Sequence, residues 1–213
     1  DQWYPKNSDW KYRGYMDIAT AVRLSINTVA AQVLDKLGLD ASTNFLKNKL
    51  GITSLVADDY NYASLALGEL TNGISVLEMT QAYCAFDNAG IFTEARTYTK
   101  VTRVLDDGTE EVLLDNTQNQ PEAVRSEETT WYINDMLKNV VTGKFGGATG
   151  TGAQLSGMTV AGKTGTTNSN NDKWFVGYTP YYTAAVWVGY NNPERISSSN
   201  NPAVSMWKKV MAP

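Results

Sequence analysis

The stretch Gly162-Lys163-Thr164-Gly165-Thr166 decides how the rest of this chain is interpreted. It follows a short apolar run, 158–161, and it precedes a polar run, 167–172, that neither a helix nor a strand favours. Two strand-like segments come next, at 173–179 and 182–190. A lysine and two hydroxyls on the rim of a sheet, beside glycines that let a ligand approach the backbone, predict a site that holds an anion.

Two kinds of motif fit this stretch. Residues 157–164 match the phosphate-binding pattern G-x-x-x-x-G-K-[ST], but that motif needs a strand before its first glycine and a helix starting at its lysine. Here the strand-like residues lie inside the supposed loop, and a turn-like segment follows it. The other match is the K-T-G box of serine acyltransferases that bind penicillin. A chance Lys-Thr-Gly on a strand is the plain alternative to both.

Composition excludes several classes of function. The 213 residues suffice for one domain with a sizeable core, and 42% hydrophobic with 19% charged residues is ordinary for a globular protein. The net charge is −4, whereas nucleic-acid-binding domains are usually basic, so we expect no nucleic-acid partner. The apolar runs are too short to span a membrane, and we expect no direct membrane insertion by this chain.

The missing residue types restrict the chemistry further. The chain has no histidine, which excludes a Ser-His-Asp triad and the usual zinc sites. Its one cysteine, Cys84, leaves no disulfide and no thiolate metal site, and we expect it to be a core residue on an apolar helix face. We therefore expect no cofactor and no metal. Any general base is Lys, Asp, Glu or Tyr.

Helical patterns dominate a first part, residues 1–95. Asp17 is expected to cap a short helix that ends near Leu24. Residues 25–27 interrupt the pattern, and a second helix follows that Gly38 stops.

The helical pattern continues after this stop. Asp40 is expected to cap a third helix that Gly51 ends, and residues 52–74 are expected to be irregular. The sequence 75–78, Ser-Val-Leu-Glu, is a capping box that opens a helix closed by Gly90. The side chains predicted to face inward from the second, third and fourth helices are Val29, Val33, Leu34, Leu37, Phe45, Leu46, Leu50, Val76, Met79, Thr80, Tyr83 and Cys84.

A second part, 96–125, reads as a hairpin and a connector. Segments 97–105 and 110–114 flank the turn signal Asp-Asp-Gly-Thr at 106–109, and a polar connector, 115–125, follows.

The third part, 126–213, combines helices with the sheet. Ser126 is expected to cap a helix with a clean apolar face, and the glycine-rich stretch 143–152 to be a mobile connector rather than a phosphate cradle. Tight links favour antiparallel pairing of the strands, and Pro202 is expected to start a final helix. The three strands are expected at 159–166, 173–179 and 182–190, and the final helix is expected to turn Val204, Trp207 and Met211 toward them.

The tripeptide Ser25-Ile26-Asn27 gains meaning beside 163–166. Alone it is a common sequence in which the serine caps a helix. Because it breaks two helices, both of its polar side chains can face a cleft. The tripeptide followed by Lys-Thr-Gly-Thr, in this order and with helices between them, is a far more specific signal than either sequence alone. At this point the chain resembles the transpeptidase domain of penicillin-binding proteins, most closely the bifunctional class A enzymes that build peptidoglycan. The segments that carry the resemblance are 15–30, 72–83, 131–142, 162–167, 174–178 and 185–190.

The resemblance implies a fold and a set of catalytic residues. The fold is of the α/β class (α+β type), with an antiparallel sheet flanked by helices, here incomplete at its N-terminal side. In the family, the serine of an S-x-x-K motif attacks the penultimate D-Ala carbonyl of a stem peptide, and the lysine of that motif takes its proton. Carried onto this chain, Ser25 would relay a proton toward the leaving group, Lys163 would be its electrostatic partner, and Asn27 would hydrogen-bond the substrate amide.

The resemblance also implies a substrate-binding group, Thr164, Gly165 and Thr166. The two threonines would hold the terminal carboxylate of a stem peptide or a β-lactam, and the N–H of Thr166 would form half of an oxyanion hole. The implied partners are peptidoglycan stem peptides and β-lactams. The implied location is the extracytoplasmic face of a bacterial membrane, in a membrane-anchored parent.

The S-x-x-K motif itself is the departure from the family pattern. The literal matches are Ser8-Asp-Trp-Lys11, which lies in an aromatic connector, and Ser205-Met-Trp-Lys208, which follows the K-T-G box. We interpret neither as the nucleophile. We expect an N-terminal complement of the same domain to supply the serine and a strand that pairs with 182–190, so that this chain alone has an open sheet edge and is not acylated.

Other functions remain open at this point. They are a sensor or degenerate penicillin-binding domain, a β-lactamase of the same superfamily, and a P-loop NTPase. A β-lactamase needs a carboxylate that activates water, and the sequence shows none in a convincing position.

Overall fold

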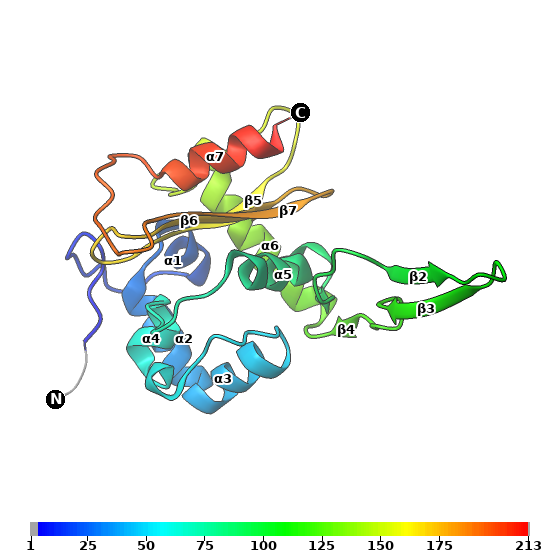
Figure 1. Ribbon diagram of the computed structural model, residues 1–213. Coiled ribbons are helices and arrows are strands. Elements are labelled where there is room, and N and C mark those ends of the chain that lie inside the picture. Colours follow the sequence, from blue (N-terminus) through cyan, green and yellow to red (C-terminus); the bar gives the residue numbers. More distant parts are fainter. Residues whose placement is uncertain (1–3, 213) are drawn as a thin grey trace.

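A three-stranded antiparallel sheet organises the computed structural model, which describes residues 4–212. Strands β5 (Ala161–Thr166), β6 (Lys173–Tyr178) and β7 (Thr183–Val188) lie in that order. Helix α7 (Pro202–Met211) covers one face, and helices α5 (Val76–Asp87) and α6 (Glu127–Thr142) pack on the other (Figure 1). Each strand pairs with its neighbour in sequence, which confirms the expected antiparallel arrangement.

The remaining elements form a helical layer and two small ribbons. Helix α1 packs on α6, and α2 packs on α4. The strand pairs β1–β4 and β2–β3 are antiparallel ribbons. The bounds of these elements are α1 Ile18–Leu24, α2 Asn27–Leu37, α3 Leu39–Asn48, the 3₁₀ turn η1 Ala57–Asp59, α4 Tyr62–Leu67, β1 Ile91–Phe92, β2 Lys100–Val104, β3 Glu110–Asp115, β4 Glu122–Ala123 and the 3₁₀ turn η2 Thr151–Ala153.

The main core lies between the sheet and α7. The rings of Phe175 and Trp207 meet edge to face with centroids 5.1 Å apart, and both side chains are fully buried. The indole Nε1 of Trp207 donates to the carbonyl of Ala184 at 3.0 Å, so the polar edge of this ring is also satisfied. The final helix therefore faces the sheet as predicted, with Val204 buried and Met211 packed against the same cluster.

Several helix ends agree with their predicted caps. The side chains of Asp17 and Ser126 accept N–H groups from the first turns of α1 and α6. Ser75 and Glu78 form the predicted capping box of α5. Gly38 follows α2 directly, as expected.

Other expectations for the helical part are wrong. Helix α3 begins at Leu39 with Gly38 at its cap position, so Asp40 lies in the first turn instead of capping it. The region 52–74 is not irregular, because it contains η1 and α4. Helix α4 is only 6 residues long. Asn61 caps its start, because its side chain accepts from Ser64 N, and Gly68 follows its last residue.

Some predicted core positions face solvent. Val33, Leu37 and Val76 are 48%, 55% and 38% exposed, because they lie at the margins of their apolar stripes, whereas Leu34 and Leu50 are buried. Cys84 is half-buried rather than a core residue. Gly51 and Gly90 do not end α3 and α5 themselves but follow those helices in left-handed conformations.

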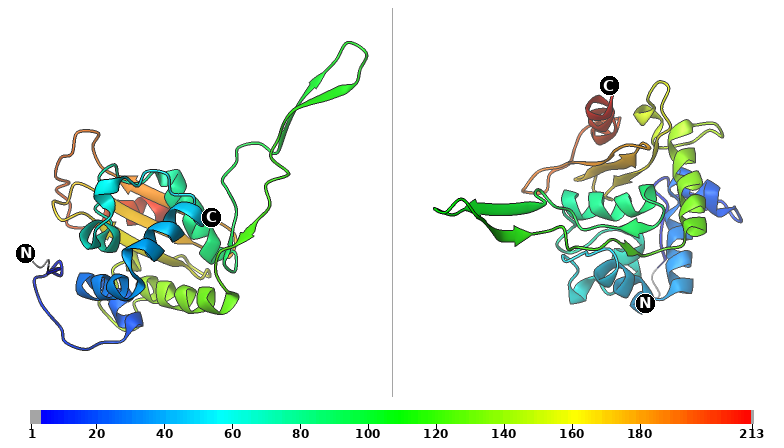
Figure 2. Two further views of the ribbon diagram at one scale, coloured as in Figure 1. Left: turned by 90° about the horizontal axis from the view of Figure 1, so that it is seen from below. Right: turned by 90° about the vertical axis from the view of Figure 1, so that its right-hand side faces the viewer.

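The β2–β3 hairpin projects from the body of the molecule, as both views in Figure 2 show. It confirms the hairpin predicted around 106–109, with a register shift between Val101 and Thr102. Among the described residues no strand pairs with the outer side of β7, so the expected open edge is present. Within residues 4–212 we find no helix with the length and hydropathy of a membrane span. Residues 1–3 and 213 of the expected first and third parts lie outside the described residues.

Candidate functional site

Strand β5 places the Lys-Thr-Gly-Thr stretch at the edge of the sheet. It pairs only with β6 among the described residues, and Lys163 lies opposite Val176. A Cβ on Gly162 would lie 2.7 Å from Phe175 Cζ and 2.7 Å from the carbonyl oxygen of Val176, so this position requires glycine. Because Lys163 lies inside a strand and not at the start of a helix, the P-loop alternative is excluded.

The break between α1 and α2 presents Ser25. This residue ends α1 in a left-handed conformation with a φ of 56°, and its N–H donates to carbonyls of the preceding turn. Helix α2 then starts at Asn27, only two residues later. Ser25 thus caps the end of α1 through its backbone N–H, in line with the plain alternative of a helix-capping serine, but its hydroxyl takes no part in the cap and faces the sheet.

Lys163 and Ser25 meet between the sheet and the helical layer. The ammonium of Lys163 donates to Ser25 Oγ at 2.7 Å and to the carbonyl of Thr164 at 3.0 Å. Among residues 4–212 it forms no ion pair with a carboxylate. Burial lowers the pKa of Lys163 to about 8. The site therefore holds a cation whose neighbours are neutral, which suits the binding of an anionic group.

Asn27 is fixed by the N-terminal segment. Its side-chain Nδ2 donates to the carbonyl of Lys6 at 2.8 Å. That segment is in turn anchored by the buried Asn7, whose Oδ1 accepts from Thr28 N at 3.2 Å and whose Nδ2 donates to the carbonyl of Lys11. The orientation of the Asn27 amide is thereby set, with one of its N–H groups already used.

The glycine-rich segment 143–152 contributes a residue that sequence reasoning missed. Thr149 Oγ1 lies 2.7 Å from Thr164 Oγ1, within hydrogen-bond distance. The segment is held against α1, because Arg23 Nη1 donates to the carbonyl of Gly146 at 2.9 Å. At Gly147, with φ of +68°, a Cβ would lie 2.5 Å from Leu24. The only sequence signal for Thr149 was a hydroxyl among glycines, which we interpreted as part of a connector.

These elements enclose one cleft of about 760 Å³. It brings together Ser25, Asn27, Thr164 and Thr166 of the predicted site, while Lys163 reaches it through Ser25 and Gly165 lies between the two threonines. The residues that line the cleft are Tyr4, Pro5, Lys6, Asn7, Ser8, Trp10, Leu24, Ser25, Asn27, Leu67, Thr149, Thr164, Thr166, Thr167, Asn168, Asn170 and Asn201. In this lining, as far as the structure describes it, there is no Asp or Glu.

The loop 167–172 forms a further wall that the sequence did not reveal. Asp172 ties it to the sheet, because its carboxylate accepts from Thr167 Oγ1 at 3.2 Å and from Trp187 Nε1 at 2.9 Å. Asn168 N donates to Glu69 Oε1 at 3.0 Å, so the segment between α4 and α5 also holds this loop. The polar composition of 167–172 by itself predicted only a turn.

The two literal S-x-x-K matches lie in different settings. Ser8 lines the cleft, but it sits in a turn and not at the start of a helix, and Lys11 is exposed. Ser205 and Lys208 are exposed on α7, on either side of the buried Trp207. Ser8 and Lys11 lack the helical setting that brings the serine and the lysine of such a motif to one face. Ser205 and Lys208 share a face of α7, but neither residue lines the cleft.

Comparison with known proteins identifies the family of this chain. The family model described as "Penicillin binding protein transpeptidase domain" matches residues 1–211. "Penicillin-binding protein 1A" of Clostridium acetobutylicum is 38% identical over 207 residues, which are 97% of this chain and 24% of that protein. "Penicillin-binding protein 4" of Bacillus subtilis is 34% identical over 209 residues, with 97% of this chain and 32% of that protein covered. The chain thus spans about a quarter to a third of these curated relatives.

Solved structures show the same fold. Penicillin-Binding Protein 1A from Haemophilus influenzae superposes with a TM-score of 0.74 at 22% identity, covering 98% of this chain and 35% of that one. The D,D-transpeptidase domain of a peptidoglycan glycosyltransferase from Eggerthella lenta gives 0.73 at 23% identity, covering 96% of this chain and 54% of that one.

Proposed function

Because the chain belongs to the penicillin-binding protein transpeptidase family, we propose that it is the substrate-binding part of a peptidoglycan D,D-transpeptidase that works through a serine acyl-enzyme. One observation carries the proposal: the contact of Lys163 Nζ with Ser25 Oγ at 2.7 Å, at a cleft that also exposes Asn27 and Thr164. No chemistry in this arrangement requires a cofactor.

The nucleophile is proposed to lie outside these residues. In the parent enzyme a serine from the N-terminal complement attacks the carbonyl between the two D-alanines of a stem peptide, and the lysine of its S-x-x-K motif takes its proton. The bond to the terminal D-Ala breaks, and Ser25 passes a proton to the departing amine. An amine of a second stem peptide then takes the acyl group, which completes the cross-link. With a β-lactam the same attack opens the ring and leaves a covalent adduct.

The described residues supply binding and electrostatics for this reaction. The ammonium of Lys163 stabilises negative charge at Ser25 and attracts the carboxylate of the substrate. Thr164 and Thr166 hold that carboxylate by their hydroxyls, and Thr149 orients the hydroxyl of Thr164. An edge strand leaves alternate N–H groups unpaired, and the proposed oxyanion donor is the N–H of Thr166. A Cβ at Gly165, between the two threonines, would lie 3.0 Å from Trp174 Cβ on the neighbouring strand, so glycine lets β5 and β6 approach closely here.

The open edge of β7 supports the proposed complement. Its unpaired backbone groups need a partner strand, and a segment of the same domain is the expected one. The partners are accordingly this complement, peptidoglycan stem peptides and β-lactams. The proposed location of the reaction is the extracytoplasmic face of a bacterial cell membrane, because peptidoglycan stem peptides are its proposed substrates.

A β-lactamase and a non-catalytic sensor are the alternative functions. Rapid hydrolysis of an acyl-enzyme needs a carboxylate that activates water, and the described lining of the cleft contains none. A degenerate sensor would need neither the contact between Lys163 and Ser25 nor the lowered pKa of Lys163. A transferase needs both side chains. These observations favour the transpeptidase.

The intact mass of the protein after incubation with benzylpenicillin tests the proposal. The measurement compares this chain with a version extended upstream to include the S-x-x-K segment. A single penicilloyl adduct on the extended version only is the expected result. An adduct on the chain alone would show that one of its own serines, with Ser8 first to be examined, is the nucleophile.

A further inference from the structure

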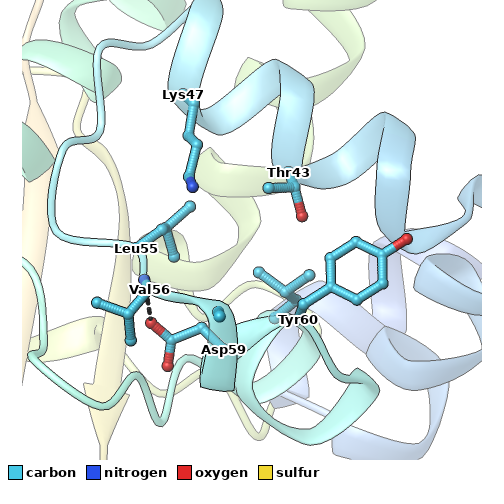
Figure 3. A pocket seen from close by; sticks show the side chains of 8 residues that line it. Thr43, Lys47, Leu55, Val56, Asp59 and Tyr60 are labelled. Carbon is cyan, nitrogen blue, oxygen red and sulfur yellow. Dashed lines mark hydrogen bonds between the residues drawn. The ribbon is translucent and has the colours of Figure 1, made fainter.

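A second pocket lies in the helical layer, between α3 and the segment that carries η1 and α4 (Figure 3). Its volume is about 360 Å³, and it shares no lining residue with the cleft described above. The lining residues are Thr43, Lys47, Leu55, Val56, Ala57, Asp59, Tyr60 and Leu65. A pocket of this size suits a small molecule.

Two donors of α3 lie one above the other along the wall of the pocket. Thr43 and Lys47 are four residues apart, so they share one face of the helix. Figure 3 shows the ammonium of Lys47 and the hydroxyl of Thr43 pointing into the pocket. Lys47 forms no ion pair in the part of the chain that the structure describes. Burial opposes the ionisation of Asp59, while hydrogen bonds and the charge of Lys47 lower its pKa, so Asp59 partly compensates this charge. The ammonium of Lys47 can still donate hydrogen bonds to a ligand.

The hydroxyl of Thr43 is buried without a partner. Its Oγ1 has no contact with solvent and no hydrogen-bond partner. Buried hydroxyls in folded proteins are normally satisfied, so an unpaired one on a pocket wall indicates a missing partner. A hydrogen-bond acceptor placed between this oxygen and Lys47 would satisfy both groups.

The other polar groups around the pocket are already engaged. The carboxylate of Asp59, which is 1% exposed, accepts from Val56 N at 3.1 Å, from Thr71 N at 2.7 Å and from Thr71 Oγ1 at 2.8 Å. The hydroxyl of Tyr60 donates to Asp40 Oδ1. Figure 3 shows this hydroxyl directed away from Asp59. The polar groups left for a ligand are thus a cation and a hydroxyl.

The remaining lining is apolar. Leu55 is buried and belongs to the second core cluster, and Leu65 packs against the same cluster. Val56 and the ring of Tyr60 complete the walls. This surface would cover a short hydrocarbon group.

We propose that this pocket binds a small monocarboxylate that carries a short branched apolar group. The carboxylate lies between Lys47 Nζ and Thr43 Oγ1, and the hydrocarbon packs on Leu55, Val56 and Leu65. The site is separate from the transpeptidase cleft, so its occupancy does not depend on the proposed reaction.

Isothermal titration of the protein with isovalerate tests the proposal, with isovaleramide as the neutral probe of the same shape. We expect saturable binding of isovalerate. The affinity for isovaleramide is expected to be lower by about tenfold or more, because the amide lacks the negative charge. Lys47→Met keeps the hydrocarbon stem and is expected to weaken isovalerate binding by about tenfold. Thr43→Val keeps the shape and is expected to weaken it several-fold. Lys209→Met, an exposed position on α7, is the matched control and leaves binding unchanged.

Three results would each overturn the inference. They are equal binding of the acid and the amide, unchanged binding in Lys47→Met, or loss of isovalerate binding when a β-lactam occupies the cleft of the extended protein. The last result would place the ligand in the transpeptidase cleft instead. Failure of penicillin acylation, in contrast, would contradict the proposed function and leave this pocket untouched.

Discussion

Lys163 Nζ lies 2.7 Å from Ser25 Oγ, although 138 positions separate the two residues in the chain. The contact joins the edge strand β5 to the break between α1 and α2, so it connects the sheet with the helical layer. Because the ammonium is buried among neutral groups, its charge is little compensated within the protein. An anionic substrate group at the cleft would supply the missing counter-charge.

Replacement of Ser25 by alanine is expected to impair acylation and leave folding intact. Ser25→Ala in the extended protein removes the proposed proton relay, and loss of a proton-transfer group lowers rates by about 10²- to 10⁴-fold. Stopped-flow acylation by a fluorescent penicillin measures the effect. Ser8→Ala, in the same cleft, is the control and should change the rate by less than about threefold, within the range of a surface substitution. If Ser8→Ala lowered the acylation rate more than Ser25→Ala, the proton relay would have to be assigned to Ser8 instead of Ser25.

The pH dependence of acylation should report the Lys163 ammonium. Burial lowers the pKa of Lys163 to about 8, so the positive charge is lost as pH rises through that value. The second-order acylation rate with a β-lactam carboxylate is therefore expected to fall above pH 8, by at most about tenfold per pH unit. Lys163→Arg stays charged and, where it is active, should show no such fall between pH 8 and 10. A rate that rises across pH 8 in the wild type would contradict the electrostatic role.

Thr149 should matter for carboxylate binding. Thr149→Val removes the hydroxyl that contacts Thr164, and loss of such a hydrogen bond to a group that binds charge is expected to weaken β-lactam binding by about tenfold. The concentration for half-maximal acylation should rise while the limiting rate changes little. Thr149→Ser restores the hydroxyl and should restore binding. A methyl ester of the same β-lactam, which lacks the charge, should not distinguish the variants; if it does, the effect is structural.

Glu78 should contribute to stability only above acidic pH. Burial opposes its ionisation, but hydrogen bonds from Thr53 and Ser75 lower the pKa of Glu78 to about 2, from an ordinary value of 4.5. The folded pKa is the lower one, so its contribution is complete above pH 4.5 and is lost as pH falls from 4.5 to 2. Glu78→Gln is therefore expected to lower the free energy of unfolding by about 1 kcal/mol at pH 7, and not below pH 2.

Urea unfolding at several pH values measures this contribution. Glu128→Gln, in the exposed first turn of α6, is the matched control and should change the free energy of unfolding by less than about 0.5 kcal/mol throughout. A Glu78→Gln effect that is the same at pH 2 and pH 7 would assign the loss to packing and not to charge.

The core beneath α7 should depend on Trp207. This side chain is fully buried, packs on Phe175 and donates to the carbonyl of Ala184. Trp207→Ala is expected to lower the free energy of unfolding by about 3–5 kcal/mol. Trp131→Ala, at a side chain that is 59% exposed on α6, should cost less than about 1 kcal/mol. Chemical denaturation followed by circular dichroism compares the two, and equal losses would contradict the described core.

Local sequence signals predicted the elements that carry the site. The capping box at Ser75, the cap at Ser126 and the strand patterns after residue 158 rest on neighbours in the chain, so composition and periodicity were sufficient. Helix α4 was missed because its 6 residues are too few for an apolar period to emerge. The exposed positions on α2 and α5 were misassigned because the width of an apolar stripe depends on which elements pack against it.

By itself the sequence determined the family, the antiparallel sheet, the break at Ser25 and the set of polar groups that bear the proposed chemistry. Only the tertiary structure decided that Thr149, the loop 167–172 and the N-terminal segment enclose the same cleft, and that Lys163 has neutral neighbours. The reason is physical. A cap or a turn depends on hydrogen bonds between residues a few positions apart, whereas a cleft depends on packing between segments that the chain order does not place together.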